Sequence, residues 1–203
     1  MLKLAGELIE GQLADHIARL DAHTYNIFEQ VAINRPRLPF LPTGYITDSA
    51  YALTANRLYA VPFPVVRAMT IDRLMSRVKT LDDGKTLRIG ILNDDGNIYP
   101  GTVLNQGGTV DCSGAGMKTI TLDPTVSLSK GIYWLACICD GTPDLYRYVA
   151  YVSILGGYTT SILRYQAAGI YKDDTYGELP TFPEGGTYHY HLPMMGVRIA
   201  SLD

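Results

Sequence analysis

The sequence lacks a strong excess of charge of one sign. Its 17 lysine and arginine residues against 20 aspartate and glutamate residues give a formal net charge of -3. Lysine and arginine nowhere form the run that a protein uses to neutralise the phosphates of DNA or RNA. The composition therefore argues against a general nucleic-acid-binding protein.

Long hydrophobic runs are also missing. No apolar stretch approaches the roughly 20 residues that a helix needs to cross a bilayer. Lys3, Glu7 and Glu10 interrupt the first residues, so the apolar region of a signal peptide is not present there. We expect neither membrane insertion nor a signal peptide.

Cysteine is scarce. Cys112, Cys137 and Cys139 are an odd number and have no spacing typical of a disulfide framework. A zinc site would need a second pair of ligands, which the sequence does not offer. We expect three buried free thiols in a protein that folds in a reducing cytoplasm.

Enzyme signatures are absent as well. The sequence has no Gly-x-Ser-x-Gly elbow, no P-loop and no His-Glu-x-x-His motif. We therefore expect a protein that is not an enzyme and that needs no cofactor or metal. A polysaccharide hydrolase is an alternative, because a carboxylate pair could come from Asp173, Asp174, Glu178 and Glu184, although acids in a loop rich in glycine and proline are usually just solvated.

Residues 1–34 are the one strongly helical part. Apolar residues recur there at spacings of four and three, which predicts the seam of a coiled coil. The seam positions are Leu13, Ile17, Leu20, Thr24, Ile27 and Val31. Isoleucine at both kinds of seam position favours three strands. The alternative is an ordinary amphipathic helix that packs on its own domain.

Proline ends this helix and begins a spacer. Pro36 lacks the amide donor that a helix needs, and residues 35–43 have a proline at every third position. This pattern predicts an extended segment that lies along a surface. The predicted organisation is a helix over residues 1–34 for oligomerisation and attachment, a spacer over residues 35–43 and a β domain over residues 44–203.

From Gly44 onward, the hydrophobic period changes from near 3.6 to 2. Turn signals follow every eight to twelve residues, which is typical of an all-β sandwich or barrel. The predicted strands are Tyr45–Leu53, Leu58–Val66, Met69–Thr80, Leu87–Leu92, Val103–Leu104, Gly108–Cys112, Met117–Leu122, Gly131–Asp140, Leu145–Leu155 and His189–Ala200. Asp123-Pro124 is predicted as a turn, and residues 93–97 as a hairpin turn rather than a calcium loop.

Gly131–Asp140 is predicted as the central strand, with Leu145–Leu155 as its partner. This strand holds the single tryptophan, Trp134, and is apolar on both faces. Because successive side chains point to opposite faces, both faces must be covered. The second cover is either another layer of the same domain or a neighbouring subunit.

Tyrosine is the outlier of the composition, with 15 residues. Those in the last third are Tyr146, Tyr148, Tyr151, Tyr158, Tyr165, Tyr171, Tyr176, Tyr188 and Tyr190. An aromatic ring with a polar tip suits contact with a sugar or with another protein, and it also suits an ordinary strand. The candidate contacts for a glycan or protein are Tyr158, Tyr165, Tyr171 and Tyr176.

His189-Tyr190-His191 is predicted to place two imidazoles on one face of a strand. Three copies around a threefold axis would offer six nitrogens to a metal. The alternative, which we favour, is a pair of surface or hydrogen-bonded histidines.

Several motifs in the body resemble the jelly-roll domains of tailed-bacteriophage virion proteins. They are Leu53–Phe63, Met69–Arg73, Arg88–Ile91, Asn93–Gly101 and Gly131–Ala136. The resemblance implies a jelly-roll-like antiparallel sandwich, homotrimers, and an N-terminal segment bound to the particle. Fibres of that kind have a long shaft, whereas this chain has one short helix, which favours a small appendage or capsid-surface knob.

We therefore expect a trimeric structural protein of a bacteriophage virion, folded in the host cytoplasm. It would be a tail fibre or tail-associated protein, or a capsid decoration or head-fibre protein, with other capsid or tail proteins as partners. The alternative is a receptor-binding module for a host surface glycan.

Overall fold

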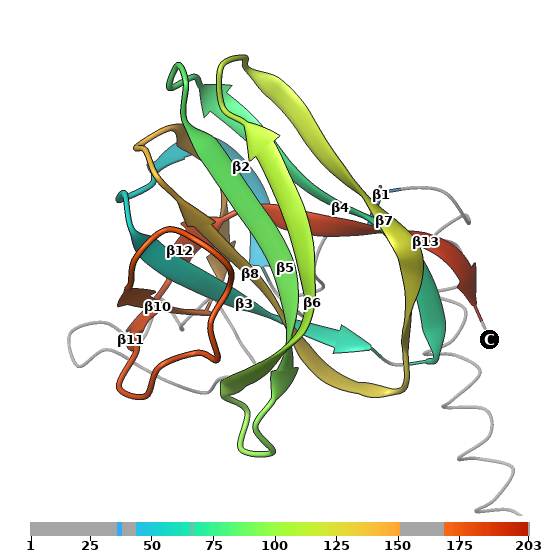
Figure 1. Ribbon diagram of the computed structural model, residues 1–203. Helices are drawn as coiled ribbons and strands as arrows, with labels where there is room; N and C mark the ends of the chain where they lie inside the picture. Colours follow the sequence, from blue (N-terminus) through green and yellow to red (C-terminus); the bar gives the residue numbers. More distant parts are fainter. Residues whose placement is uncertain (1–35, 38–43, 66, 151–168, 203) are drawn as a thin grey trace, which may run out of the picture. The chain divides into compact units, whose positions relative to one another are not determined.

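Two antiparallel β-sheets make up the body of the chain, and Figure 1 shows them as two layers. The computed structural model describes residues 36–37, 44–65, 67–150 and 169–202. The chain divides into two compact units, residues 1–35 and residues 36–203. The predicted helix and its coiled-coil seam lie outside the described residues. In the described part, no helix is both long enough and apolar enough to span a membrane.

The seven-stranded sheet consists of β1 (Pro36–Arg37), β2 (Gly44–Ala52), β4 (Met69–Thr80), β7 (Gly116–Leu128), β9 (Asp144–Ala150), β12 (His191–Pro193) and β13 (Met195–Leu202). Its strands follow the order β1-β13-β4-β9-β12, with β2 beside β9 and β7 beside β4. The six-stranded sheet consists of β11 (Thr187–His189), β10 (Gly169–Asp173), β3 (Arg57–Val65), β8 (Gly131–Cys139), β5 (Thr86–Asp94) and β6 (Pro100–Asp111), in that order. All pairings are antiparallel, so the predicted mainly β, antiparallel class is confirmed.

The tryptophan-bearing strand, β8, lies in the interior of the six-stranded sheet between β3 and β5. Its side chains alternate between two apolar clusters, as the sequence predicted. Leu135, Cys137 and Cys139 belong to the inner cluster, which fills the space between the two sheets. Trp134, Ala136 and Ile138 belong to the outer cluster, on the other face of the six-stranded sheet. All six side chains are buried.

Strand β4 follows its sequence pattern closely. Its bounds are those predicted, and Leu74, Ser76 and Val78 are buried. In the sequence, Ile71 is out of phase with the alternating Leu74, Ser76 and Val78, which predicts a bulge near Asp72 and Arg73. The register with β7 does shift between Ile71 and Arg73.

Strand β3 shows how its prolines are accommodated. It pairs with β8 from Tyr59 to Val65, and β10 pairs with its first half, from Arg57 to Ala60. Pro62 and Pro64 have the same parity, so both missing amides lie on one side of the strand. Among the described residues, no strand pairs with the second half of β3, from Val61 to Val65, on the side away from β8, as expected for a strand with two prolines.

Two predictions about connections are wrong. Residues 145–155 were expected to pair with the central strand, but β9 pairs with β2, β4 and β12 in the opposite sheet. The turn at residues 140–143 carries the chain from one sheet to the other, and local turn chemistry does not distinguish such a crossing from a hairpin. The Asp123-Pro124 peptide is cis and lies within the long strand β7 instead of forming a turn between two strands.

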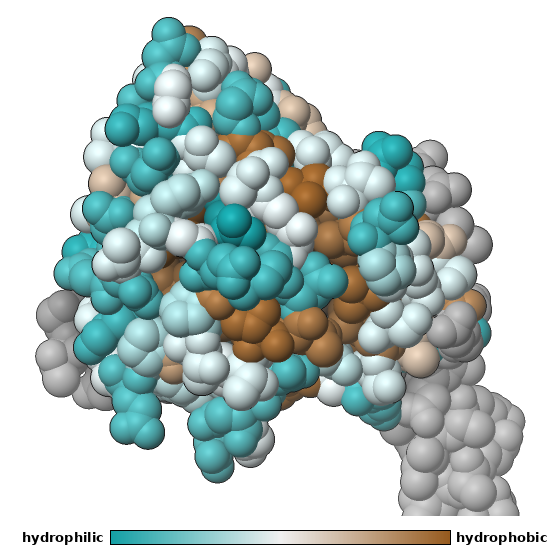
Figure 2. Space-filling model, in the orientation of Figure 1, coloured by the Kyte–Doolittle hydropathy of each residue, from teal (hydrophilic) through white to brown (hydrophobic). Residues whose placement is uncertain are grey.

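The strands β6 and β7 lie at one edge of the two sheets. Each pairs with one neighbour in the described part, β6 with β5 and β7 with β4. Figure 2 shows a band of hydrophobic surface on this face, in the region of β6 and β7. Leu104 on β6 is 40% exposed and Met117 on β7 is 51% exposed.

Candidate functional site

The tyrosine-rich end of the sandwich contains an aromatic corner, formed by Tyr51, Tyr59, Tyr171 and His189. The antiparallel register places Tyr171 of β10 opposite Tyr59 of β3, and the two ring centroids are 6.2 Å apart. Tyr51 of β2 lies 5.8 Å from Tyr59 and 6.0 Å from His189. The corner thus joins side chains of both sheets at one side of the inner cluster.

Burial raises the pKa of two phenols of this corner, those of Tyr51 and Tyr59. It raises the pKa of Tyr51, and the neighbouring Tyr59 raises it further. Burial also raises the pKa of Tyr59, whose hydroxyl accepts a hydrogen bond from the Thr54 amide at 2.9 Å. Neither phenol is an activated base or nucleophile, because such a role would require a lowered pKa.

An ion pair covers the outer side of Tyr171. The Arg57 guanidinium lies 4.5 Å from the centre of the Tyr171 ring, and its Nε donates to Asp173 Oδ1 at 2.6 Å. This hydrogen bond lowers the pKa of Asp173, whose side chain is 75% exposed. Since Arg57 occupies one face of the ring, that face of Tyr171 is not open to a sugar.

The two histidines do not share a strand face, so that prediction is wrong. His189 ends β11 in the six-stranded sheet, and His191 begins β12 in the seven-stranded sheet. His189 Nδ1 accepts a hydrogen bond from the His191 amide at 3.2 Å and lies 2.6 Å from the His191 carbonyl oxygen. The chain changes sheet at Tyr190, so the two imidazoles lie on different strands, with ring centroids 6.1 Å apart and ring planes at 66°.

His191 is held neutral at neutral pH. Its Nδ1 lies 3.3 Å from Arg147 Nη1. Burial lowers the pKa of His191 to about 4, with the Arg147 cation and His189 adding to the shift. Within the described ranges, no group of three or more histidine, cysteine, aspartate or glutamate residues is placed to hold a metal ion.

Residues 174–186, here called the strap, cross the outer face of the six-stranded sheet. Hydrogen bonds fix its start at Asn56, whose carbonyl accepts from the Asp174 amide at 2.8 Å and whose Oδ1 accepts from the Tyr176 amide at 3.1 Å. Asn56 has a left-handed φ of 59°, a conformation that asparagine tolerates better than most residues.

The middle and the end of the strap are fixed by two further side chains. Gln106 pairs with the backbone of Leu179, donating to its carbonyl at 2.9 Å and accepting from its amide at 2.8 Å. The Tyr99 hydroxyl donates to the Pro183 carbonyl and accepts from the Gly186 amide, both at 2.9 Å. The strap therefore has a defined backbone path despite its lack of periodicity.

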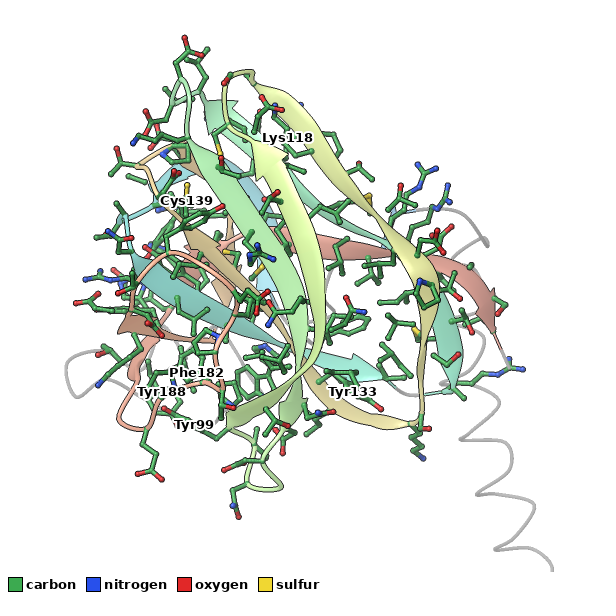
Figure 3. The ribbon with its side chains drawn as sticks, in the orientation of Figure 1. Tyr99, Lys118, Tyr133, Cys139, Phe182 and Tyr188 are labelled. Atoms are coloured by element: carbon green, nitrogen blue, oxygen red, sulfur yellow. The ribbon has the colours of Figure 1, made fainter. Side chains whose placement is uncertain are left out.

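The strap covers the apolar outer face of β8. Its Leu179 and Phe182 are 3% and 4% exposed and pack in the outer cluster with Trp134. Figure 3 shows Phe182 beside Tyr99, and their ring centroids lie 5.7 Å apart. The Trp134 indole donates to Asp94 Oδ2 at 2.9 Å, so its single polar atom is satisfied. The second cover predicted for β8 is thus a segment of the same chain.

The four acids proposed for hydrolysis do not converge as a pair. Asp173 is bound by Arg57, and Asp174 Oδ1 accepts a hydrogen bond from the Thr175 amide at 2.7 Å. Glu178 and Glu184 are exposed on the strap. The hydrogen bond from Arg57 lowers the pKa of Asp173, whereas a general acid needs a raised pKa.

The tyrosines proposed as glycan contacts are not brought into one site. Tyr158 and Tyr165 lie outside the described residues. Tyr171 packs against the inner cluster, and Tyr176 packs against the outer cluster on the opposite face of the six-stranded sheet. Among the described tyrosines, Tyr188 is exposed, at 42%.

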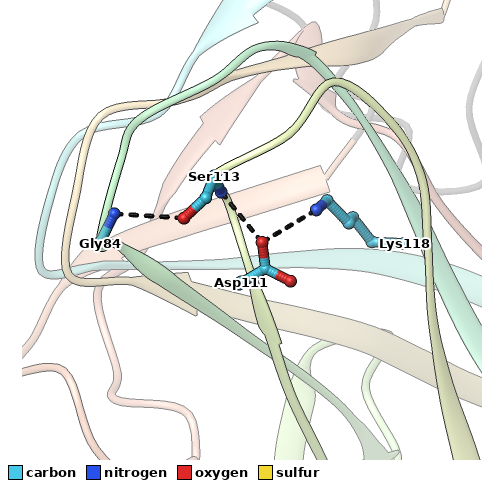
Figure 4. A network of polar contacts seen from close by, with 4 residues as sticks. All are labelled: Gly84, Asp111, Ser113 and Lys118. Atoms are coloured by element: carbon cyan, nitrogen blue, oxygen red, sulfur yellow. Dashed lines mark hydrogen bonds and ion pairs between the residues drawn. The ribbon is translucent and has the colours of Figure 1, made fainter.

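The cysteines are free and buried, as predicted. Cys112 directly follows β6. Figure 4 shows a network of polar contacts that joins the neighbouring Asp111 and Ser113 to Gly84 and Lys118. Asp111 Oδ1 accepts from the Ser113 amide at 3.1 Å and from Lys118 Nζ at 3.2 Å, and the Gly84 amide donates to Ser113 Oγ at 3.3 Å. Residues 112–115 form the connection between β6 and β7.

Sequence reasoning missed the residues that hold the strap. Asn56, Tyr99 and Gln106 have no local signal, because their strap partners are between 73 and 120 residues away along the chain. A weaker signal was present in Leu179 and Phe182, two large apolar residues within a stretch rich in glycine and proline.

No protein-family model matches the chain, and no curated protein matches it either. Among solved structures, the chain is similar to a clostridial cysteine protease, Cwp84, after propeptide cleavage, with 11% sequence identity and a TM-score of 0.44. The similarity covers 79% of this chain and 41% of that chain, so this chain spans less than half the length of the protease. A likeness at this level carries no argument about the activity of this chain.

Proposed function

We propose that this protein is a non-enzymatic structural protein of a bacteriophage virion, displayed as a trimeric surface appendage. Its N-terminal segment, with the seam from Leu13 to Val31, would join three copies and attach them to the particle. The body would be a jelly-roll-like sandwich that faces outward, on a tail fibre or as a capsid decoration. The host cytoplasm is where the chain would fold before assembly.

This proposal depends on where the residues that resemble virion jelly rolls lie in the fold, which is on strands of both sheets. Residues 57–63 lie on β3, residues 69–73 on β4, residues 88–91 on β5 and residues 131–136 on β8. Residues 93–101 close the β5–β6 hairpin, where Asp94 and Asp95 accept hydrogen bonds from Gly96 and Asn97 amides. The similar residues therefore build the framework of the sandwich.

The division of the chain also supports display of the body by a separate segment. Residues 1–35 and residues 36–203 form two compact units. The charged and aromatic side chains described above hold the sandwich together, which is the role expected of them in a structural protein.

Light scattering on the full chain and on a chain that begins at Pro36 tests the proposal. The full chain should have three times the monomer mass, and the shortened chain should be a monomer. An antibody against the sandwich should also label the surface of phage particles. A monomeric full chain would remove the basis of the trimeric appendage.

A glycan-binding module is the second candidate, and the exposed ring of Tyr188 is the observation that favours it. A half-exposed tyrosine offers a face on which a sugar ring can stack. Retention on a glycan array should then be lost in Tyr188→Ala. The Tyr171→Ala and Tyr176→Ala variants test the two other described tyrosines, whose rings pack into the fold.

A further inference from the structure

Two arginines of the described part have a buried donor atom that binds no acceptor. They are Arg73 and Arg88, and the atom in each is Nε. Burying a donor without an acceptor costs free energy, so a buried donor of this kind suggests an acceptor that comes from outside the chain. The surroundings of Arg88 indicate what that acceptor is.

Arg88 lies on the outer face of the six-stranded sheet. On β5, it is opposite Ile138 of β8 and Thr109 of β6. Directly opposed residues of antiparallel strands share a face, and Ile138 belongs to the outer cluster. Thr86 lies on the same face, because it is two residues before Arg88. Thr109 is exposed and Arg88 is half-buried, so a molecule in solvent can reach the guanidinium.

A carboxylate and a phenol complete this group. Asp140 Oδ1 accepts a hydrogen bond from the Thr86 amide at 2.6 Å, which holds the carboxylate and leaves its Oδ2 as an acceptor. Burial raises the pKa of the Tyr176 phenol, and Asp140 raises it further. Arg88 and a hydrogen bond with Thr86 lower the same pKa, so both charges lie near this hydroxyl. We call Thr86, Arg88, Thr109, Asp140 and Tyr176 the outer polar site.

No excess of positive charge surrounds the outer polar site. Asp111 lies opposite Thr86 and is bonded by Lys118 at 3.2 Å (Figure 4). The cations in this area are Arg88, Lys85 and Lys118, and the carboxylates are Asp82, Asp111, Asp140, Asp174 and Glu178. Three cations against five carboxylates disfavour an anionic ligand, and the guanidinium disfavours a cationic one. A neutral ligand that both accepts and donates hydrogen bonds fits this balance.

We infer that the outer polar site binds a neutral sugar unit through two adjacent hydroxyl groups. The Arg88 guanidinium donates to the hydroxyl oxygens, and Asp140 Oδ2 accepts a hydroxyl hydrogen. Because a hydroxyl is both a donor and an acceptor, two neighbouring hydroxyls match a neighbouring guanidinium and carboxylate, and the charged partners strengthen these hydrogen bonds. The hydroxyls of Thr109 and Tyr176 flank the pair and can donate or accept.

This site goes beyond the proposed structural role and is separate from Tyr188. Tyr188 lies on β11, at one end of the six-stranded sheet, whereas β5 is next to the strand at the other end. The inference does not depend on the trimer, because all five residues belong to one copy. Its failure would leave the proposed function intact, and a monomeric chain would leave the inference intact.

Binding of the labelled full chain to an array of neutral and acidic glycans tests the inference. The chain should be retained on neutral glycans, and raising the salt from about 0.05 M to about 0.5 M should not release it, because no charge of the ligand is screened. Retention on sialylated or sulfated glycans alone would overturn the inference, because the ligand would then be an anion. Absence of retention on every glycan would overturn it too.

Two substitutions assign the binding to this site. Arg88→Met keeps an apolar stem but removes the donors, and Asp140→Asn keeps the oxygen that binds the Thr86 amide but replaces Oδ2 by a donor. Each should reduce retention about tenfold, with a parental midpoint in urea unfolding. Arg73→Met is the matched control, because its Nε is also buried without an acceptor, and it should not change retention. Parental retention in Arg88→Met, or loss in Tyr188→Ala alone, would contradict the inference.

A measurement on the unaltered chain does not depend on how a variant folds. In a proton–nitrogen correlation spectrum of the full chain, the Arg88 Nε–H signal should move when the methyl glycoside of a retained sugar is added. The Arg73 Nε–H signal should stay, and sodium acetate at the same concentration should move neither signal. A sugar that leaves the Arg88 signal in place, or acetate that moves it further than the sugar does, would contradict the inference.

Discussion

The side chains on both faces of β8 are buried, but different kinds of structure cover the two faces. The inner face packs against a second sheet, whose strands are joined by backbone ladders. The outer face packs against the strap, which has no ladder of its own and is held by the side chains of Asn56, Tyr99 and Gln106. The comparison shows that burial alone does not determine how a surface is kept from water. It also predicts that the outer face can open locally while the inner face stays closed.

The largest expected loss of stability comes from substitutions at two neighbouring residues that lie on opposite faces of β8. Trp134→Ala should lower the free energy of unfolding by about 4 kcal/mol, and Leu135→Ala by about 3 kcal/mol. Both side chains are fully buried, so both substitutions leave cavities. Urea unfolding measures the two losses, and a loss below about 1 kcal/mol at Trp134 would mean that the outer face is not a core.

The next prediction tests whether the strap opens independently of the sheets. Phe182→Ala should lower the free energy of unfolding by about 3 kcal/mol, because the ring is 4% exposed and contacts the outer cluster. Amide hydrogen exchange should accelerate along the strap but not along β4. Tyr188→Ala is the exposed control, with an expected change within about 0.5 kcal/mol. Equal acceleration in both sheets would show that the strap does not open separately.

A smaller effect tests the hydrogen bonds that hold the strap. Gln106→Ala should cost about 2 kcal/mol, because it leaves both backbone groups of Leu179 without their partner. In Gln106→Glu, the carboxylate still accepts from the Leu179 amide but no longer donates to the carbonyl. In urea unfolding, Gln106→Glu should therefore lose about half as much free energy of unfolding as Gln106→Ala. Identical losses in the two variants would contradict the arrangement in which Gln106 makes two hydrogen bonds to Leu179.

The smallest expected effect is a pH dependence of stability that comes from His191, beside the aromatic corner. Burial, Arg147 and His189 lower the pKa of folded His191 to about 4, below its ordinary value of 6.5. Between these values the unfolded chain binds a proton that the folded chain does not, so stability is present above pH 6.5 and is lost as pH falls toward 4.

Urea unfolding at about pH 7 and about pH 5 measures this loss for the parent and for His191→Gln. The parent should be less stable at the lower pH, and the variant should show a smaller decrease. The carboxylates Asp72 and Asp173 have lowered pKa values, so their contribution is lost only at more acidic pH. A variant that loses as much stability as the parent would assign the pH dependence to other groups.

The sequence predicted the parts of this fold that depend on local pattern. The alternation in β4 and β8 gave their bounds or nearly so, and the phase change at Ile71 indicated the register shift. The partner of β9 was not predictable in this way, because the turn before it is compatible with either sheet. Long-range topology, not turn chemistry, decides which strand lies beside it.

The candidate site was predicted less well, for a physical reason. Its tyrosines were visible in the composition, but whether a ring is exposed depends on distant partners such as Arg57, which lies on Tyr171. The two histidines were separated by a change of sheet at Tyr190 that no local rule indicates. The strap has no hydrophobic periodicity, and only the structure shows that it packs on the outer face of β8.

Acrylamide quenching of the single tryptophan tests most directly whether the chain covers its own central strand. Trp134 should be poorly quenched at all protein concentrations, including those at which the chain is monomeric, and it should become accessible in Phe182→Ala. Strong quenching in the dilute protein that disappears as the concentration rises would contradict the account, because a neighbouring subunit would then be the cover.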